Sequence, residues 1–314
     1  MKVLVLGDAN VDLEITLPAA ESVGVHTNPD PVLFGGGSAA NTAAALAKLG
    51  VECRFVGTVG QDEHGAFAID SLKSAGVDTS LIVQVAGEPT VQVIVVVQPD
   101  GDRLIYVWPP AGGAHSALTE EQACSAIAGA EWVHVTGLCL RVSPAAESIL
   151  AAMEAAGAAG IPVSLDLNLR LENWGWDRDF RSVVEHAVEH AEFVMGAAFD
   201  EIVPLAGVED PRDAAMVLAG DNRTVIARRG AGGAFAAHEG TITSSPGFHV
   251  DVVNTVGAGD AFNAGFIASR LHGASLETAL QTGNAVAALT IGQPGARTSP
   301  DRPTLETFLT DRLP

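Results

Sequence analysis

Asn254-Thr255-Val256-Gly257-Ala258-Gly259-Asp260 separates a short strand-like run, residues 248–253, from an apolar helical pattern that begins at Ala261. The segment therefore predicts a tight turn from a strand into a helix. The first N–H groups of a helix have no partner within the helix, and the helix dipole makes them a binding site for an anion. Gly257 and Gly259 have no Cβ atom, so the backbone can approach that anion closely.

Asp260 lies in the first turn of the predicted helix, beside the predicted anion site. A carboxylate beside a bound anion is unfavourable unless it handles a proton, and an anion site with a base in one turn suits phosphoryl transfer to a hydroxyl group. Taken alone, the same residues also fit a glycine-rich helix start in which Asp260 interacts favourably with the helix dipole. The rest of the chain decides between these two interpretations.

Two motifs resemble those of the ribokinase-like (PfkB) carbohydrate kinases. Residues 254–262 resemble the family's C-terminal signature, D-T-x-G-A-G-D-A-F, with Asn254 in place of the first Asp. Gly35-Gly36-Gly37-Ser38-Ala39-Ala40-Asn41-Thr42-Ala43 resembles the N-terminal signature, so the resemblance covers nearly the whole chain. It implies an α/β fold with a doubly wound, mostly parallel sheet, helices on both faces and a small β-sheet lid.

The resemblance also implies an activity, the transfer of the γ-phosphate of ATP to a hydroxymethyl group of a small sugar with the help of Mg²⁺. Asp260 would take the proton from the attacking hydroxyl group. The backbone N–H groups of residues 256–260, including those of Gly257, Ala258 and Gly259, would stabilise the negative charge that develops on the phosphoryl group.

Composition limits the other possibilities. The chain has 314 residues, 47% of them hydrophobic, which is enough for one large α/β core. A net charge of −21 argues against nucleic acid and membrane surfaces as partners, since both attract basic patches. Three cysteines without metal-ligand spacing, and no apolar run long enough for a signal peptide or a membrane span, predict a cytoplasmic protein.

A hairpin is predicted between the α/β units. Residues 90–98 and 103–108 flank Pro99-Asp100-Gly101-Asp102, in which Asp-Gly favours a tight turn. With the extended stretches near 11–17 and 28–34, this hairpin predicts a lid inserted from about 11–34 and 88–112 into a single domain, residues 1–314. The resemblance implies that the lid covers the substrate and pairs two copies in a homodimer.

The sugar-binding residues are implied by the resemblance. Asp12 follows the first strand-like run, and an ionised carboxylate accepts hydrogen bonds from hydroxyl groups. Ser38 is expected to cap the helix that contains Asn41, as a helix-capping residue type after a glycine loop. The residues expected to hold the sugar are Asp12, Gly36, Gly37, Asn41, Arg170 and Asp260.

Arg170 ends Asp166-Leu167-Asn168-Leu169-Arg170, which resembles a motif of fructokinase-like and 2-keto-3-deoxygluconate kinase members. Its planar guanidinium suits a sugar or a carboxylate. A structural ion pair of Arg170 with Asp166 or Glu172 is the alternative.

Residues 228–233, Arg228-Arg229-Gly230-Ala231-Gly232-Gly233, resemble the family's glycine turn along the nucleotide phosphates, and the two arginines supply positive charge in an acidic protein. A hairpin turn with solvated arginines is the alternative. The expected nucleotide-binding residues are Arg228, Gly230, Gly233, Gly257 and Gly259 at the phosphates, and Asn284 and Ala288 at the adenine.

The metal sites implied by the resemblance are incomplete. Glu201 matches the Glu of the family's N-x-x-E motif, which helps to hold Mg²⁺, usually through water, but Ala198 replaces the Asn. Relatives hold a monovalent cation at the first Asp of the C-terminal signature, with carbonyl groups of a loop that corresponds to residues 292–299. Asn254 carries no net charge, so we expect its amide to bond to that loop and a cation to be unnecessary.

Four rival functions remain open. A nucleoside kinase needs a surface for the base, which 5% aromatic residues disfavour. For a 2-keto-3-deoxygluconate kinase, Pro110 stands where relatives carry an Arg, which favours a neutral sugar. Ala198 and Asn254 fit a catalytically weak sugar-binding regulatory protein, although such a protein has no use for Asp260 as a base. An NAD-dependent enzyme lacks support, because no G-x-G-x-x-G follows the first strand.

Overall fold

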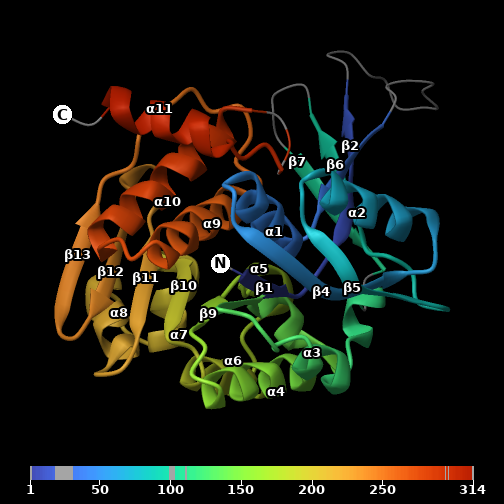
Figure 1. Cartoon of the computed structure of the whole chain (residues 1–314), viewed down its shortest axis with the longest axis horizontal. Helices are drawn as coiled ribbons and strands as arrows, with labels where there is room; N and C mark the ends of the chain where they lie inside the picture. Colours follow the sequence, from blue (N-terminus) through green and yellow to red (C-terminus); the bar gives the residue numbers. More distant parts are fainter. Residues whose placement is uncertain are drawn as a thin grey trace.

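The computed structural model describes residues 2–17, 31–98, 103–109, 112–293, 295 and 297–312. In these residues, strands and helices alternate and build a nine-stranded sheet and a separate four-stranded sheet (Figure 1). The predicted turn at residues 99–102 and Pro110 lie outside the described residues. The α/β fold class predicted from the sequence, with a mostly parallel sheet and a small second sheet, is confirmed.

The large sheet has the order β13-β12-β11-β10-β9-β8-β1-β4-β5. The strands from β11 to β5 pair in parallel because each short apolar strand is followed by a crossover, while the pairs β11–β12 and β12–β13 are antiparallel. Its strands are β1 (Lys2–Leu6), β4 (Glu52–Gly60), β5 (Asp78–Val85), β8 (Trp132–Thr136), β9 (Val163–Asp166), β10 (Phe193–Ala197), β11 (Thr224–Arg228), β12 (Ala234–His238) and β13 (Thr241–Ser245).

Helices cover both faces of this sheet and bury two apolar cores. Successive side chains of β1 point to opposite faces, so Val3 and Val5 join one core and Leu4 and Leu6 the other. Figure 1 shows the first group of helices above the sheet and the second group below it. The first group is α1 (Ser38–Lys48), α2 (Glu63–Ser74), α9 (Ala258–Leu271), α10 (Leu276–Ile291) and α11 (Arg302–Arg312); the second is α3 (Glu120–Ser125), α4 (Ala145–Ala158), α6 (Arg178–Glu189), α7 (Val203–Ala206) and α8 (Pro211–Ala219).

Short helical segments connect the larger elements. A π-helical turn, Ala198–Ile202, leads into α7. The other short segments are α5 (Leu171–Trp174) and the 3₁₀ turns Ala114–Ala117, Gly137–Arg141 and Gly230–Gly232. Within the described part of the chain, no helix is long and apolar enough to cross a membrane.

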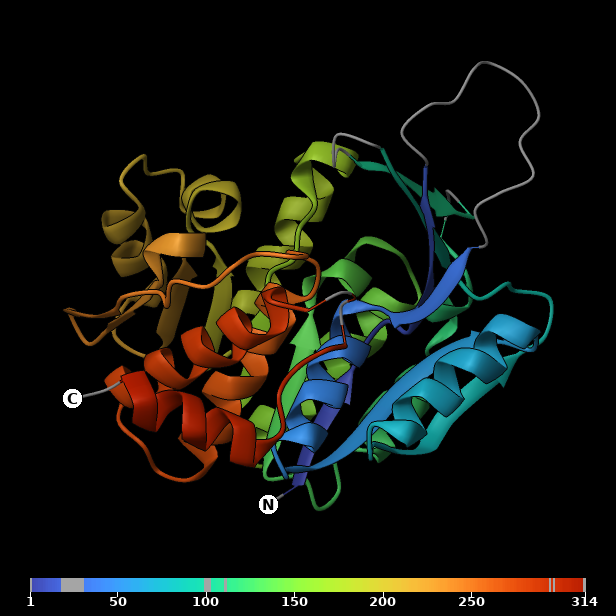
Figure 2. The same ribbon diagram turned by 90° about the horizontal axis from the view of Figure 1, so that it is seen from above.

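The small sheet has the order β3-β2-β6-β7, with β2 and β6 parallel and the other pairs antiparallel. Its strand β2 follows β1 after a three-residue connection, so the small sheet starts at the carboxyl end of β1. Figure 2 shows the small sheet standing to one side of the large sheet, close to α1. Its strands are β2 (Asn10–Thr16), β3 (Val32–Gly36), β6 (Gln92–Val97) and β7 (Arg103–Trp108).

Two local predictions were wrong. Residues 248–253 form no strand; instead, the N–H groups of Val253 and Asn254 donate to the carbonyl oxygen of Ile291 at the end of α10, and α9 begins at Ala258. Ser38 does not cap α1, because it is already the first helical residue.

The cap of α1 comes from Asp8, which lies thirty residues earlier in the chain. Its two carboxylate oxygens accept hydrogen bonds from the N–H groups of Ser38 at 2.9 Å and Ala39 at 3.1 Å. A carboxylate at the start of a helix also interacts favourably with the helix dipole. The Ser38 hydroxyl group is therefore free for another partner.

Candidate active site

The two sequence motifs meet at the start of α9. Gly257 is the residue before the helix and has a left-handed backbone, with φ 78°, which glycine adopts without strain. Asp260, one turn in, accepts a hydrogen bond from the Ser38 hydroxyl group at 2.7 Å and another from the Asn41 amide nitrogen at 3.0 Å. Both donors belong to α1, so the N-terminal motif holds the carboxylate of the C-terminal motif.

The pKa of Asp260 is raised from 3.8 to about 7. Burial is the largest cause, and the nearby Asp166 carboxylate adds to it, while the hydrogen bonds from Ser38 and Asn41 oppose the rise. A general base works best when its pKa is close to the working pH, so Asp260 is suited to accept a proton at neutral pH.

Arg228, at the end of β11, forms the ion pair of this site. Its Nη2 lies 2.7 Å from Asp166 Oδ1, and its Nη1 donates to the Gly259 carbonyl oxygen at 3.2 Å and to Asn263 Oδ1 at 2.8 Å. The guanidinium therefore holds the glycine turn in place through the Gly259 carbonyl oxygen. Because Asp166 pairs with Arg228, the alternative ion pair of Arg170 with Asp166 is wrong; the Arg170 side chain is exposed.

Glu201 has both carboxylate oxygens engaged with the backbone. Oε1 accepts from the N–H of Leu169 at 2.8 Å, and Oε2 accepts from the N–H of Ala197 at 2.7 Å. This arrangement ties the loop after β9 to the end of β10. The pKa of Glu201 is raised by burial and by Asp166, and Arg228, 3.8 Å from Oε2, opposes the rise. The Ala198 side chain is buried in the apolar core on the α4 and α6 side.

On the small-sheet side, Asp12 lies in β2 against β3. A Cβ atom at Gly36 would collide with the Asp12 carboxylate, so glycine is needed at this position. The pKa of Asp12 is raised to about 6, mainly by burial, with Asp8 and Glu14 adding to the rise and Arg297 opposing it. The structure thus connects Asp12 through Gly36, Arg297 and Asn41 to Asp260, while the predicted role of these residues in sugar binding remains a prediction.

Arg297 is a component of the site that sequence reasoning missed. Its Nε donates to Asn41 Oδ1 at 3.0 Å, Nη1 to Ser71 Oγ at 2.8 Å and Nη2 to the Gly36 carbonyl oxygen at 2.6 Å. Its pKa is lowered to about 10 by burial, against the attraction of nearby carboxylates, so it remains a cation at neutral pH. A Cβ atom at Gly35 would collide with this guanidinium.

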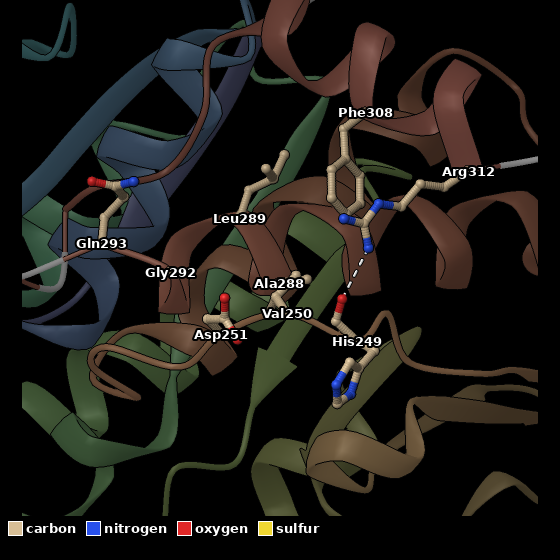
Figure 3. A pocket seen from close by; sticks show the side chains of 9 residues that line it. All are labelled: His249, Val250, Asp251, Ala288, Leu289, Gly292, Gln293, Phe308 and Arg312. Carbon is tan, nitrogen blue, oxygen red and sulfur yellow. Dashed lines mark hydrogen bonds between the residues drawn. The ribbon is translucent and has the colours of Figure 1, made fainter.

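A cavity of about 420 Å³ lies beside the glycine turn, between residues 249–251, α10 and α11 (Figure 3). The guanidinium of Arg312 lies 4.6 Å from the ring centre of Phe308 and donates to the His249 carbonyl oxygen at 2.9 Å. The cavity is lined by His249, Val250, Asp251, Ala288, Leu289, Gly292, Gln293, Phe308 and Arg312.

Of the two residues predicted to contact adenine, Ala288 lines this cavity. Asn284 is buried instead, and its amide nitrogen lies within hydrogen-bond distance of the Ser245 carbonyl oxygen, the Ser245 hydroxyl group and the Pro246 carbonyl oxygen, at 3.1 to 3.2 Å. It ties α10 to the end of β13. Gly233 packs so closely on the same segment that a Cβ atom would collide with the Ser245 carbonyl oxygen.

Comparison with known proteins identifies the family. The model of the pfkB family carbohydrate kinases matches residues 1–303. The chain belongs to this family. It is therefore a carbohydrate kinase, the enzyme class expected from the two motifs.

Several relatives are similar over most of their length. The chain is 35% identical to the ATP-dependent ribose-1-phosphate kinase of Halopiger xanaduensis, covering 100% of this chain and 99% of the relative. It is 31% identical to the aminoimidazole riboside kinase of Salmonella typhimurium, covering 98% and 95%. It is 31% identical to the fructokinase of Klebsiella pneumoniae, covering 85% and 83%.

Two solved structures have the same fold. A fructokinase double mutant from Vibrio cholerae O395, described with fructose, ADP and potassium ion bound, is 28% identical, has a TM-score of 0.84 and covers 98% of both chains. The aminoimidazole riboside kinase of Salmonella enterica, described in complex with aminoimidazole riboside and an ATP analogue, is 28% identical with a TM-score of 0.81, covering 98% of this chain and 100% of that chain.

The charge at the carbohydrate kinase's phosphate side fits a divalent cation. Asp166, Glu201 and Asp260 are close enough for Asp166 to raise the pKa of the other two, and Arg228 pairs with Asp166. Three carboxylates against one guanidinium leave negative charge and oxygen donors, which are the ligands that Mg²⁺ prefers.

Asn254 shapes the glycine turn. It is buried, and its side-chain oxygen accepts a hydrogen bond from the N–H of Val256 at 3.0 Å. The side-chain oxygen at the position where relatives hold a monovalent cation therefore accepts a hydrogen bond within the turn. The expected absence of a cation remains a prediction.

Proposed function

We propose that the chain transfers the γ-phosphate of ATP to a hydroxymethyl group of a small, neutral sugar, with Asp260 as the general base. The observation that carries the proposal is the position of Asp260, which is partly buried in the first turn of α9, held by Ser38 and Asn41, and has a pKa of about 7. A group with this pKa is ionised to a large extent at neutral pH and still basic enough to accept a proton.

In the proposed reaction, Asp260 accepts the proton of the sugar hydroxyl group as its oxygen attacks the γ-phosphorus. The bond from phosphorus to the bridging oxygen of ADP breaks, and ADP leaves. The N–H groups of residues 256–260, including Gly257, Ala258 and Gly259, stabilise the charge on the transferred group. Arg228 supports this turn through the Gly259 carbonyl oxygen. Asp166 and Glu201 would hold Mg²⁺, which would supply positive charge against the phosphates.

The nucleotide base is proposed to occupy the cavity of about 420 Å³ beside the glycine turn. Ala288 and Phe308 offer apolar surface to a planar ring, and Arg312 covers one end of the cavity (Figure 3). Gly230 and Gly233 border the segment that leads to this cavity and are proposed to lie along the phosphates. Asn284 supports the cavity wall rather than the base.

Asp12, Gly36, Gly37, Asn41 and Arg170 are proposed to hold the sugar. Arg297 is the cation that faces three carboxylates from the loop after α10. Asp8, Asp12 and Asp260 each act to raise the pKa of its guanidinium. Three carboxylates against one guanidinium favour hydroxyl groups over a second anion, because like charges repel in a poorly solvated site. A neutral sugar therefore fits best.

Ribose 1-phosphate is the second candidate, because the relative that acts on it is 35% identical over nearly the full length of both chains. Its phosphate would need a cation at the acceptor side, and Arg297 has three of its nitrogen atoms bonded to protein acceptors.

The test is ADP release with a panel of fructose, ribose, ribose 1-phosphate, aminoimidazole riboside, 2-keto-3-deoxygluconate and common nucleosides. We expect the highest kcat/KM with a neutral sugar. A clear preference for ribose 1-phosphate would replace the neutral-sugar assignment. If no acceptor in the panel were phosphorylated, the kinase mechanism through Asp260 would be contradicted.

We also propose that the small sheet is a lid, formed from about 11–34 and 88–112 within a single domain of 1–314, and that it pairs two copies. The strand β7 is at the edge of the small sheet, and its apolar residues from Leu104 to Trp108 are 45–59% exposed. An exposed apolar edge strand favours association with another chain.

Light scattering should show a dimer that Ile105→Glu converts to a monomer, whereas Val217→Glu, at an exposed position in α8, should leave the dimer intact. A monomeric unmodified protein would contradict the lid contact.

A cytoplasmic location is part of the same proposal. It is supported by the use of ATP as donor and by three cysteines, Cys53, Cys124 and Cys139, that form no disulfide.

A further inference from the structure

Two histidines and a glutamate converge between α4 and α6, away from the catalytic turn. His186 and His190 are four residues apart, so both imidazoles lie on the same side of α6, and Glu154 faces them from α4. The ligand atoms of the three residues all lie within 4.8 Å of one another. We call this cluster the α4–α6 cluster.

The distances in the cluster are those expected around a metal ion. The Nε2 atoms of His186 and His190 lie 3.3 Å and 3.5 Å from the same oxygen, Glu154 Oε1. A strong ion pair or charge-assisted hydrogen bond is shorter, about 2.7–2.9 Å. Adjacent ligands of a tetrahedral metal with bonds of about 2.0–2.2 Å are separated by about 3.3–3.6 Å. The two distances to Glu154 Oε1 therefore match the edges of a ligand tetrahedron, and all the ligand atoms lie within 4.8 Å of one another.

A second carboxylate lies near one of the imidazoles. Glu189 Oε2 lies 3.7 Å from Nδ1 of His186, on the other side of the ring from Glu154. On metal binding, a hydrogen bond from Nδ1 to this carboxylate would fix the tautomer in which Nε2 carries the free lone pair. With neutral imidazoles, Glu154 and Glu189 also leave negative charge at the cluster, which attracts a cation.

We propose that Glu154, His186 and His190 bind one divalent transition-metal ion, with zinc as the best fit and a solvent molecule as the fourth ligand. Two imidazoles and one carboxylate are a common set of zinc ligands with one open position. Cobalt and nickel should bind as well, because imidazole and carboxylate ligands bind all the late divalent first-row metals.

The position of the cluster gives the metal a role in the fold and not in phosphoryl transfer. His190 directly follows α6 and precedes β10, so the cluster lies near the amino ends of the strands, whereas Asp166 and Arg228 are at the carboxyl ends. Figure 1 shows α4 and α6 together below the sheet, with the lid and α1 above it. A metal bound here links α4 to α6 and stabilises the folded protein.

The experiment is a zinc titration by calorimetry, with protein that carries no histidine tag, followed by thermal unfolding with and without zinc. The variants are His186→Gln, His190→Gln, Glu154→Gln and Glu189→Gln. His272→Gln is the matched control, because His272 is also an exposed histidine at the end of a helix, α9, but has no acidic partner among the described contacts. Cobalt is the second probe, since its visible spectrum reports tetrahedral ligands.

We expect one equivalent of zinc to bind and to raise the Tm of the unmodified protein and the His272→Gln control. Each histidine variant should weaken zinc binding at least about tenfold and lose the rise in Tm. Glu189→Gln should weaken it less. Absence of a saturable equivalent, or unchanged affinity in the His186→Gln and His190→Gln variants, would overturn the proposal.

Discussion

Asp260→Asn should remove most of the activity and should gain stability relative to the unmodified protein as the pH rises. Asp260 is held in a conformation in which ionisation is unfavourable, because burial and Asp166 raise its pKa from 3.8 to about 7. Asparagine has nearly the same shape and never ionises, so the variant escapes this cost. Ionised Asp260 is thus predicted to lower the free energy of unfolding of the protein.

The sign and size follow from the raised pKa. Between pH 4 and 7 the unfolded chain has lost the proton and the folded protein keeps it, so the free energy of unfolding falls as the pH rises through this range and levels off above it. One pKa unit corresponds to about 1.4 kcal/mol. Between pH 5.5 and pH 8, the cost of ionising Asp260 grows by about 2 kcal/mol, and this is the amount by which the variant should gain on the unmodified protein.

Comparing the two proteins at two pH values cancels the change in stability that comes from altered hydrogen bonds, which does not depend on pH. Asp260 accepts from Ser38 and Asn41, and Asn41 cannot reverse its amide because its oxygen accepts from Arg297. In the Asp260→Asn variant the new amide oxygen can accept from Asn41, but the new NH₂ group then faces the Ser38 hydroxyl group, which must turn to accept from it. Any cost of this change is the same at both pH values.

The assay is urea unfolding of both proteins at pH 5.5 and pH 8, with kcat measured for each. We expect the difference in stability to shift by about 2 kcal/mol in favour of the variant at pH 8, and kcat to fall by about 10²–10⁴-fold. An equal difference at both pH values would show that the pKa of Asp260 is not raised. Near-normal turnover in the variant would show that Asp260 is not the base.

Three further predictions concern the arginine and metal sides of the site. Arg297→Lys should raise the sugar KM about tenfold or more, because a compact ammonium cannot reach the three separate acceptors that the planar guanidinium spans; steady-state kinetics with Arg302→Lys as control tests this, and an unchanged KM would contradict it. Glu201→Gln should raise the Mg²⁺ concentration for half-maximal rate, whereas the exposed Glu172→Gln should not; equal Mg²⁺ titrations would remove Glu201 from the metal site. Activity should differ little among K⁺, Na⁺ and a bulky organic cation, and Asn254→Asp should make it more K⁺-dependent; strong K⁺ activation of the unmodified protein would contradict our interpretation of Asn254.

The alternation of strands and helices and the predicted hairpin were sufficient to indicate the two sheets. The meeting of the two motifs was implied only by their resemblance to those of the carbohydrate kinases. The resemblance also implied Asp12, Gly36, Asn41 and Asp260 as one group, and in the structure Asp12 lies against Gly36, Arg297 joins Gly36 to Asn41, and Asn41 binds Asp260. Residues 248–253 look like a strand because they are apolar and extended, but they lie against the end of α10 and pair with no strand.

The residues that the sequence did not indicate act through long-range contacts. Arg297 is a single cation in a loop, and nothing in its neighbours shows that it reaches Asn41, Ser71 and Gly36. Asp8 caps a helix that begins thirty residues later, which local capping rules do not anticipate. Such partners depend on how α1, β2 and the loop after α10 pack together, and that packing has no local sequence pattern.

In the proposed reaction, the two arginines explain how the site can hold a nucleotide on one side and a sugar on the other side of the same carboxylate. Arg228 binds Asp166 and the back of the glycine turn, so it sets the position of the N–H groups on the phosphate side. Arg297 binds Asn41 and Gly36, so it sets the donors and acceptors on the sugar side. Asp260 lies between the two halves, joined to the sugar half by Asn41 and to the phosphate half by its own helix. Each half can therefore be altered by one arginine substitution without removing the base, which predicts that Arg228 variants affect ATP use first and Arg297 variants affect sugar use first.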